Sequence, residues 1–282
     1  TMAASASAVL LAGGKVVFAD IEPETMCLDL ARAEQLISPR TKAVMFVSLN
    51  GRSPAEFANF AQRCRARGVK VIEDAAQSLG SLHVGRHLGT FGDCGCFSFS
   101  SQKIVTTGQG GAVVTNDEEI HRQLGLLRDF GRLSGGSDHY LSVGWNLKFT
   151  DLQAVIGVEQ MRRLPALVER KRKIFARYQE HRAGSRGLEI LRTDLASVSP
   201  WFVDVLVDKG LKRPFMEHLH RNGVGSREIY PPLHAEPAFA DGGSFPRADE
   251  ASARGVWLPS SLRLEDGQIE EICGLIRRFF QR

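Results

Sequence analysis

The sequence lacks the features of a membrane or secreted protein. No apolar run is long enough to cross a bilayer, and no charged stretch precedes an apolar one near its start, so neither a membrane span nor a signal peptide is predicted. Its five cysteines, an odd number without the spacing of a disulfide framework, favour a reducing, cytoplasmic location. Internal repeats and low-complexity segments are also missing. With 43% hydrophobic and 24% charged residues, the composition is that of an ordinary globular protein.

Three kinds of ligand site lack their sequence signatures. No His/Cys pair has zinc-ligand spacing, and Cys94 and Cys96 are expected on opposite faces of a strand, so no metal is predicted. The glycines of 108–111 complete neither a P-loop nor a dinucleotide fingerprint. The basic run Arg170–Lys173 has no interleaved aromatic residues, and the net charge is only +4. We therefore expect a solvated helix face there and no nucleic-acid surface.

The first half of the chain alternates short apolar strands with amphipathic helices. The helix expected at 54–67 has Ser53 as its N-cap and Pro54 in its first turn. Repeated strand–helix–strand units predict an α/β fold with a mostly parallel sheet sandwiched by helices. The elements expected in this half are strands at 15–20, 43–47, 69–72, 95–99 and 111–115, and helices at 30–37, 54–67 and 117–128.

The second half has a different pattern. A polar, Gly-rich loop is expected at 131–138, and Thr150 and Asp151 begin a long helical region that reaches about residue 182, with Pro165 as a break or kink. Beyond it, a strand at 201–207 and helices at 214–221 and 269–280 predict a smaller α+β domain. We therefore divide the chain into a large cofactor-binding domain, 1–165, and a linking helix with a small C-terminal domain, 166–282.

A lysine and an aspartate stand at the ends of two predicted strands. Asp74 ends the strand at 69–72, and ligands of open α/β sheets bind outside the carboxyl ends of strands. Lys103 follows the strand at 95–99. Pyridoxal phosphate chemistry requires this pair, since an amine must condense with the cofactor aldehyde and a carboxylate must keep the pyridine nitrogen protonated. The alternatives are that Asp74 only caps the turn after it and that Lys103 is a surface lysine.

Two polar residues lie close to this pair in the sequence. Gln77 follows Asp74 by one helical turn and projects to the same side, although a glutamine here is also compatible with an ordinary surface position. Ser98 stands between Phe97 and Phe99 and therefore faces away from both, where its hydroxyl is suited to a phosphate.

Four segments, in this order and spacing, resemble the DegT/StrS-type sugar aminotransferases, which are fold-type I pyridoxal phosphate enzymes. They are 71–78 (VIEDAAQS), 97–103 (FSFSSQK), 107–115 (TGQGGAVVT) and 144–154 (GWNLKFTDLQA), with weaker agreement at 230–234 and 257–259. The resemblance covers essentially the whole chain. It implies the fold-type I architecture and pyridoxal 5'-phosphate as the cofactor.

The resemblance also implies roles for individual residues. Lys103 would bind the cofactor covalently, Asp74 would contact the pyridine nitrogen, Gln77 the ring hydroxyl and Ser98 the phosphate. Asn146, with Lys148 as a second candidate, would reach the cofactor phosphate of a neighbouring subunit. The active unit is therefore expected to be a homodimer with shared active sites.

The implied reaction moves an amino group from glutamate to a nucleotide-linked keto sugar. The stretch 130–138 is similar to that of perosamine-type 4-aminotransferases, which favours a 4-keto-6-deoxyhexose. Arg227, Tyr230 and His234 lie in the segment that approaches the sugar nucleotide in relatives. An equally weighted alternative is that they only form a loop around Pro231 and Pro232.

The chain departs from the family pattern in several places. In the family, some tens of residues come before the point at which this chain begins, so the opening phosphate-binding segment is expected to be missing. Met2 stands where the family has an aromatic ring, and Ser100 and Gln109 replace residues that are often His and Glu. One alternative is a catalytically impaired or regulatory homologue that keeps the fold. Another is a sugar dehydratase, which Lys103 disfavours because those relatives carry histidine there.

Overall fold

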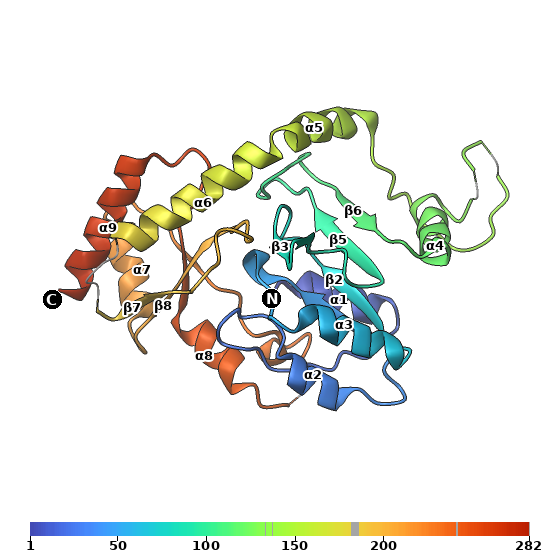
Figure 1. The fold of residues 1–282 in the computed structure, drawn as a ribbon, viewed down its shortest axis with the longest axis horizontal. Helices are drawn as coiled ribbons and strands as arrows, with labels where there is room; N and C mark the ends of the chain where they lie inside the picture. Colours follow the sequence, from blue (N-terminus) through green and yellow to red (C-terminus); the bar gives the residue numbers. More distant parts are fainter. Residues whose placement is uncertain (133, 137, 182–185, 241, 282) are drawn as a thin grey trace.

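Two four-stranded sheets organise the chain (Figure 1). The computed structural model describes residues 1–132, 134–136, 138–181, 186–240 and 242–281. Within these residues, no helix combines the length and the apolar character needed to span a bilayer.

The first sheet has the strand order β1-β2-β5-β6. Strands β1, β2 and β5 are parallel, and β6 is an antiparallel edge strand. The parallel pairing aligns the carboxyl ends of three strands at one edge and places Asp74, the last residue of β2, opposite Cys96. The strands span Ala43–Val47 (β1), Lys70–Asp74 (β2), Cys94–Ser98 (β5) and Gly111–Val114 (β6).

Helices and short elements surround this sheet. Helix α3 buries Phe57, Phe60 and Cys64 at helical spacing, and the Phe57 ring stacks on Phe46 of β1 with centroids 3.9 Å apart. These contacts attach the helix to the sheet. The elements are α1 (Ala3–Leu11), α2 (Leu30–Leu36), a 3₁₀ turn (Leu49–Gly51), α3 (Phe57–Ala66), the hairpin β3 (Leu82–His83) and β4 (Arg86–His87), and α4 (Glu118–Arg128).

Two consecutive helices connect the sheets. Helix α5 (Asp151–Arg162) starts with a capping box between Thr150 and Gln153, and α6 (Leu164–His181) follows after a break at Arg163. Pro165 lies in the first turn of α6, where its missing N–H costs no helical bond. The expected start and the expected break of this helical region are both confirmed.

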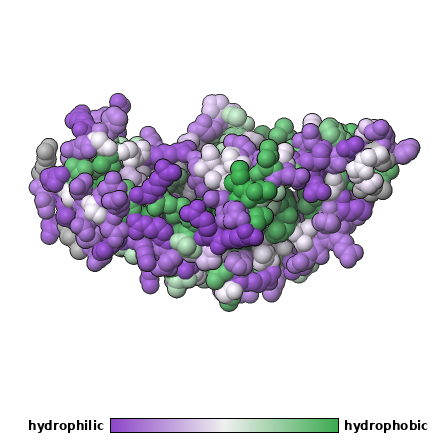
Figure 2. All heavy atoms as spheres, turned by 90° about the horizontal axis from the view of Figure 1, so that it is seen from above, coloured by the Kyte–Doolittle hydropathy of each residue, from purple (hydrophilic) through white to green (hydrophobic). Residues whose placement is uncertain are grey.

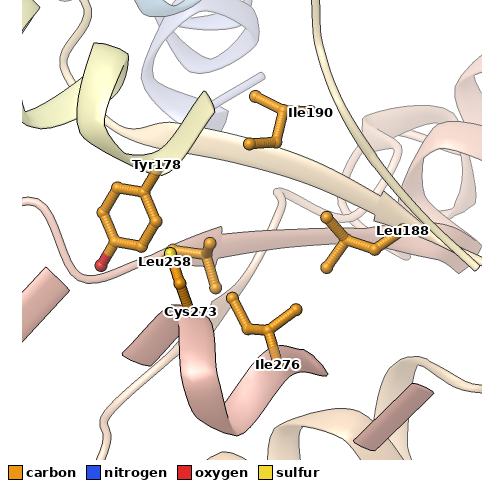
Figure 3. Close-up of a pocket in the computed structure, with 6 residues that line it drawn as sticks. All are labelled: Tyr178, Leu188, Ile190, Leu258, Cys273 and Ile276. Carbon is orange, nitrogen blue, oxygen red and sulfur yellow. The ribbon is translucent and has the colours of Figure 1, made fainter. Parts of the chain in front are cut away.

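The second sheet is antiparallel, in the order β7-β8-β10-β9. Its core is formed with α6, α7 and α9 and encloses a small apolar gap (Figure 3). The one hydroxyl at that gap, on Tyr178, donates a hydrogen bond to the Pro259 carbonyl oxygen at 2.9 Å. Among the described residues, the gap therefore has no free hydroxyl for a polar ligand. The elements are β7 (Leu188–Ile190), β8 (Val203–Val207), α7 (Lys212–Arg221), β9 (Arg227–Glu228), a 3₁₀ turn (Leu233–Ala235), α8 (Pro246–Arg254), β10 (Gly255–Leu258) and α9 (Asp266–Phe280).

Several expectations about local structure are wrong. Residues 15–20 form no strand, because no strand pairs with them; Phe18 instead packs edge-on against Phe245. Helix α3 begins at Phe57 and not at Pro54, since the Ser53 hydroxyl contacts Nδ1 of His83 at 3.0 Å and caps nothing.

Two further expectations about side-chain positions are wrong. The side chains of Cys94 and Cys96 share one face of β5 and contact each other, because residues two apart in a strand point the same way. The basic run is only partly solvated, because Lys171 is buried.

A buried carboxylate joins the two halves of the molecule. Asp204 of β8 is fully buried and accepts hydrogen bonds from Nδ2 of Asn50 at 2.5 Å, Nη1 of Arg52 at 2.6 Å and Nε1 of Trp257 at 2.5 Å. Asn50 and Arg52 belong to the first half of the chain, and Trp257 belongs to β10. The buried charge of Arg52 therefore depends on Asp204 for compensation.

Replacing Asp204 with Ala should destabilise the protein by about 3–5 kcal/mol, because it leaves the Arg52 guanidinium buried without its counter-ion. Urea unfolding measures this loss. Glu34→Ala, which removes an exposed partner of Arg63, serves as the control and should change stability little. A loss no larger for Asp204→Ala than for the control would contradict the assignment.

Candidate active site

A hollow opens at the carboxyl edge of the first sheet. It encloses about 270 Å³, including its open mouth. Residues from the first sheet line one side, and a segment that leads into β8 lines the other. The lining residues are Ala76, Gln77, Leu79, Ser98, Lys103, Ile104, Ser199, Pro200 and Trp201.

Lys103 is held in a short turn after β5. Its backbone N–H donates to the Ser100 carbonyl oxygen at 3.0 Å, and its ammonium lies 3.6 Å from the ring centroid of Trp201. Burial lowers the pKa of this amine from 10.5 to about 8, while the negative charge of Asp74 acts in the opposite direction. The two groups predicted to cooperate therefore lie within electrostatic reach of each other.

Asp74 uses both carboxylate oxygens. Oδ1 accepts a hydrogen bond from the Ala76 backbone N–H at 3.1 Å, which is the turn-capping bond weighed as an alternative. Oδ2 accepts from the Ser5 hydroxyl at 2.6 Å. Asp74 therefore caps the turn that follows it, and Ser5 at the same time holds its carboxylate at the end of β2. No sequence signal pointed to Ser5, since it lies in an Ala/Ser-rich helix.

Gln77 and Ser98 both line the hollow. Oε1 of Gln77 accepts the Asn50 backbone N–H at 2.9 Å, so its Nε2 remains as a donor. The Ser98 hydroxyl contacts the Ser100 hydroxyl at 3.3 Å. Asn50 has a φ of 55° and precedes Gly51, and this Asn-Gly pair was the available sign of an unusual turn.

The three candidate substrate residues are not equivalent. Burial raises the pKa of Tyr230, the charge of Arg227 lowers it and the charge of Asp74 raises it, so Tyr230 lies within electrostatic reach of Asp74. The Arg227 guanidinium lies 5.6 Å from the ring centroid of Tyr230. His234 instead pairs with Asp249 of α8 at 3.1 Å and packs on Phe245.

Asn146 lies apart from the hollow lining. It forms an isolated β-bridge with Asp129 at the end of α4, on the far right of Figure 1. Lys148 extends Nζ to Asp129 at 2.8 Å. Within one chain, the described structure does not bring either residue together with Lys103.

Comparisons with known proteins identify the family. Residues 1–277 match the DegT/DnrJ/EryC1/StrS aminotransferase family. The chain is 32% identical to GDP-perosamine synthase of Vibrio cholerae, over 99% of this chain and 78% of that protein. It is 34% identical to UDP-N-acetyl-3-dehydro-alpha-D-glucosamine 3-aminotransferase of Acidithiobacillus ferrooxidans, over 99% and 75%. The chain belongs to the DegT/DnrJ/EryC1/StrS aminotransferase family.

The structure agrees with this assignment. The aminotransferase TlmJ from Streptoalloteichus hindustanus superposes with a TM-score of 0.93 at 31% identity, over 99% of this chain and 76% of that one. The α/β fold and the family predicted from the four sequence segments are therefore confirmed. Enzymes of the family depend on pyridoxal phosphate, and the residues at this edge of the sheet fit that cofactor: the half-buried amine, the amide donor and the hydroxyl that line the hollow, and the fixed carboxylate of Asp74 two residues before the lining residue Ala76.

Because burial lowers its pKa, Lys103 should react with amine reagents at lower pH than the other lysines. Competitive labelling of the cofactor-free protein, read by peptide mass spectrometry between pH 6 and 11, should give Lys103 a midpoint of about 8. The peptide that carries the exposed Lys173 serves as the reference. Equal midpoints for the two lysines would exclude the buried environment described here.

Proposed function

We propose that the protein transfers an amino group from glutamate to a nucleotide-linked keto sugar, with a 4-keto-6-deoxyhexose as the acceptor. The observation that carries this proposal is the Lys103 amine, half-buried in the hollow and within electrostatic reach of Asp74. The two named relatives act on sugars linked to GDP and UDP, which supports the acceptor class. The second of these relatives is a 3-aminotransferase by name, whereas the stretch 130–138 of this chain favours position 4. Residues 133 and 137 of that stretch lie outside the described residues.

The residues of the hollow take distinct roles in this proposal. Bound pyridoxal phosphate supplies the electron sink that stabilises a carbanion at the donor carbon. Asp74, oriented by Ser5, holds the pyridine nitrogen protonated. Gln77 donates through Nε2 to the ring hydroxyl, because its Oε1 is occupied by Asn50. The Ser98 hydroxyl binds the phosphate.

Lys103 has two tasks. It would hold the cofactor covalently, and its unprotonated Nζ would accept the α-proton of the donor as a general base. With a pKa of about 8, roughly one amine in ten is unprotonated at pH 7, against fewer than about one in a thousand for an ordinary lysine. Burial therefore prepares the amine for both tasks.

Arg227 and Tyr230 are proposed to contact the sugar nucleotide, because Tyr230 lies within electrostatic reach of Asp74 and the Arg227 guanidinium lies over the Tyr230 ring. A guanidinium is suited to diphosphate oxygens. His234 has a weaker case, since its ring already has Asp249 and Phe245 as partners.

We place the enzyme in the cytoplasm, in deoxyamino sugar synthesis for a polysaccharide.

A homodimer completes this proposal. Helix α5 has no buried residue, and it continues an apolar stretch that includes Trp145 and Leu147. Figure 2, which looks onto the side where α5 lies, shows hydrophobic side chains gathered near the middle of that face. An apolar surface of this extent is typical of an interface. We infer that a second copy covers it and that Asn146, with Lys148, reaches the cofactor phosphate of that copy.

With glutamate and a panel of keto sugars linked to GDP, UDP or dTDP, the purified enzyme should aminate a 4-keto-6-deoxyhexose nucleotide. Lys103→Ala should lower this activity by at least about a thousandfold, since it removes both the covalent attachment and the base. Product mass and retention time measure the transfer. A 3-amino product would show that the enzyme aminates position 3 of the sugar and that the proposed position 4 is wrong.

The absorption spectrum separates an inactive homologue from a wrong substrate. Addition of pyridoxal phosphate to wild type should produce a visible band that Lys103→Ala lacks. If the band forms but no sugar is aminated, the protein binds the cofactor and the proposed acceptor is wrong. If no band depends on Lys103, the proposed role of the lysine is wrong.

Val155→Asp should convert the dimer to a monomer, because it places a charge in the apolar surface of α5, where Val155 is 66% exposed. Light scattering coupled to gel filtration measures the mass. Val84→Asp, at an equally apolar position that is 83% exposed on the β3–β4 turn, is the matched control and should leave the mass unchanged. A monomeric wild-type protein would refute the dimer outright.

A further inference from the structure

Trp201 contacts the reactive end of Lys103. The lysine Nζ lies over the indole at 3.6 Å from the ring centroid, which is the geometry of a cation–π contact. Among the described residues, none forms a hydrogen bond with this Nζ. The aromatic face is therefore the group that directly stabilises the ammonium in the hollow.

The indole is held from the side of the lysine. Its Nε1 donates to the Gln102 carbonyl oxygen at 2.8 Å, one residue before Lys103. The side chain of Trp201 is only 4% exposed. Because the same indole bonds the backbone beside Lys103 and covers its amine, the ring and the lysine share a fixed geometry.

The backbone of Trp201 is held from the other side by a buried lysine of α6. Nζ of Lys171 donates to the carbonyl oxygens of Trp201 at 2.8 Å and of Ser260 at 2.5 Å. The preceding Ser199 N–H donates to Oγ of Ser81 at 2.8 Å. The buried ammonium of Lys171 therefore fixes the backbone of the short segment that carries Trp201.

Asn50 ties the same segment to Gln77. The Asn50 side chain exchanges two hydrogen bonds with the Phe202 backbone, accepting from its N–H at 2.5 Å and donating to its carbonyl oxygen at 2.8 Å. Its own N–H holds Oε1 of Gln77. The position of Trp201 is therefore coupled to the residue proposed to contact the cofactor ring.

We propose that Trp201 is a further catalytic residue, whose indole face holds the Lys103 ammonium whenever the amine is not covalently bound. This inference rests on the proposed function, in which the lysine is released in each half of the reaction and must remain close. An aromatic face stabilises the cation without a directional hydrogen bond, so the amine stays free to swing back. Lys171 and Asn50 act through Trp201 as positioning residues.

The test compares Trp201→Phe with Trp201→Leu in the cofactor-free protein. Both substitutions shorten the side chain and remove the bond to Gln102, but only Phe keeps an aromatic face. The pKa of Lys103, measured by competitive labelling, should be lower in the Leu variant than in the Phe variant by about 0.5 unit or more. Phe202→Leu, which removes a neighbouring ring that packs on Trp201, is the control and should not lower the pKa of Lys103.

Equal values for the Phe and Leu variants, or a higher value for Leu, would overturn the proposal and leave Trp201 as a wall of the hollow. Tryptophan fluorescence gives a second measurement that needs no change at Trp201. It should vary with pH in wild type with a midpoint of about 8, and this step should be smaller in Lys103→Met; the buried Lys171, whose pKa is also lowered to about 8, accounts for any remainder. A step of the same size in Lys103→Met would also overturn the contact. Because neither measurement needs cofactor or substrate, their outcome is independent of the proposed amination.

Discussion

The parallel pairing of β1, β2 and β5 is the constraint on which the site depends. Parallel strands bring their carboxyl ends to one edge, and the register opposes Asp74 to Cys96. The chain leaves that same edge through Ser98 toward Lys103. The sheet geometry by itself brings the acid and the amine to the same end of the sheet.

The second half of the chain supplies what the first sheet lacks. Ser199, Pro200 and Trp201 close the hollow from the other side, and Lys171, Asn50 and Asp204 hold them in place. Each of these three groups is a polar side chain in an apolar environment, which is costly unless it is fully bonded. These buried polar groups lie at the junction between the two halves, next to the hollow. A displacement of the segment 199–201 would alter the environment of Lys103.

Patterned segments were predictable from the sequence, and isolated contacts were not. The strand 43–47, the helix start at Thr150 and the break near Pro165 follow from apolar runs, caps and proline. The strand expected at 15–20 failed because pairing depends on a neighbour that the segment itself does not reveal. Ser53 looked like a cap, but a tertiary contact with His83 took its hydroxyl. The division of the chain at residue 165 stays a prediction.

The sequence by itself determined the family and its cofactor, because those are recorded in motifs of fixed order and spacing, and the same motifs predict Lys103 as the reactive lysine. Only the tertiary structure decided that Ser5 orients Asp74, that Asn50 fixes the amide of Gln77, and that Trp201 covers the amine. Those contacts join residues up to about a hundred positions apart. Local pattern carries no information on such distances, since they are set by how the two sheets pack together.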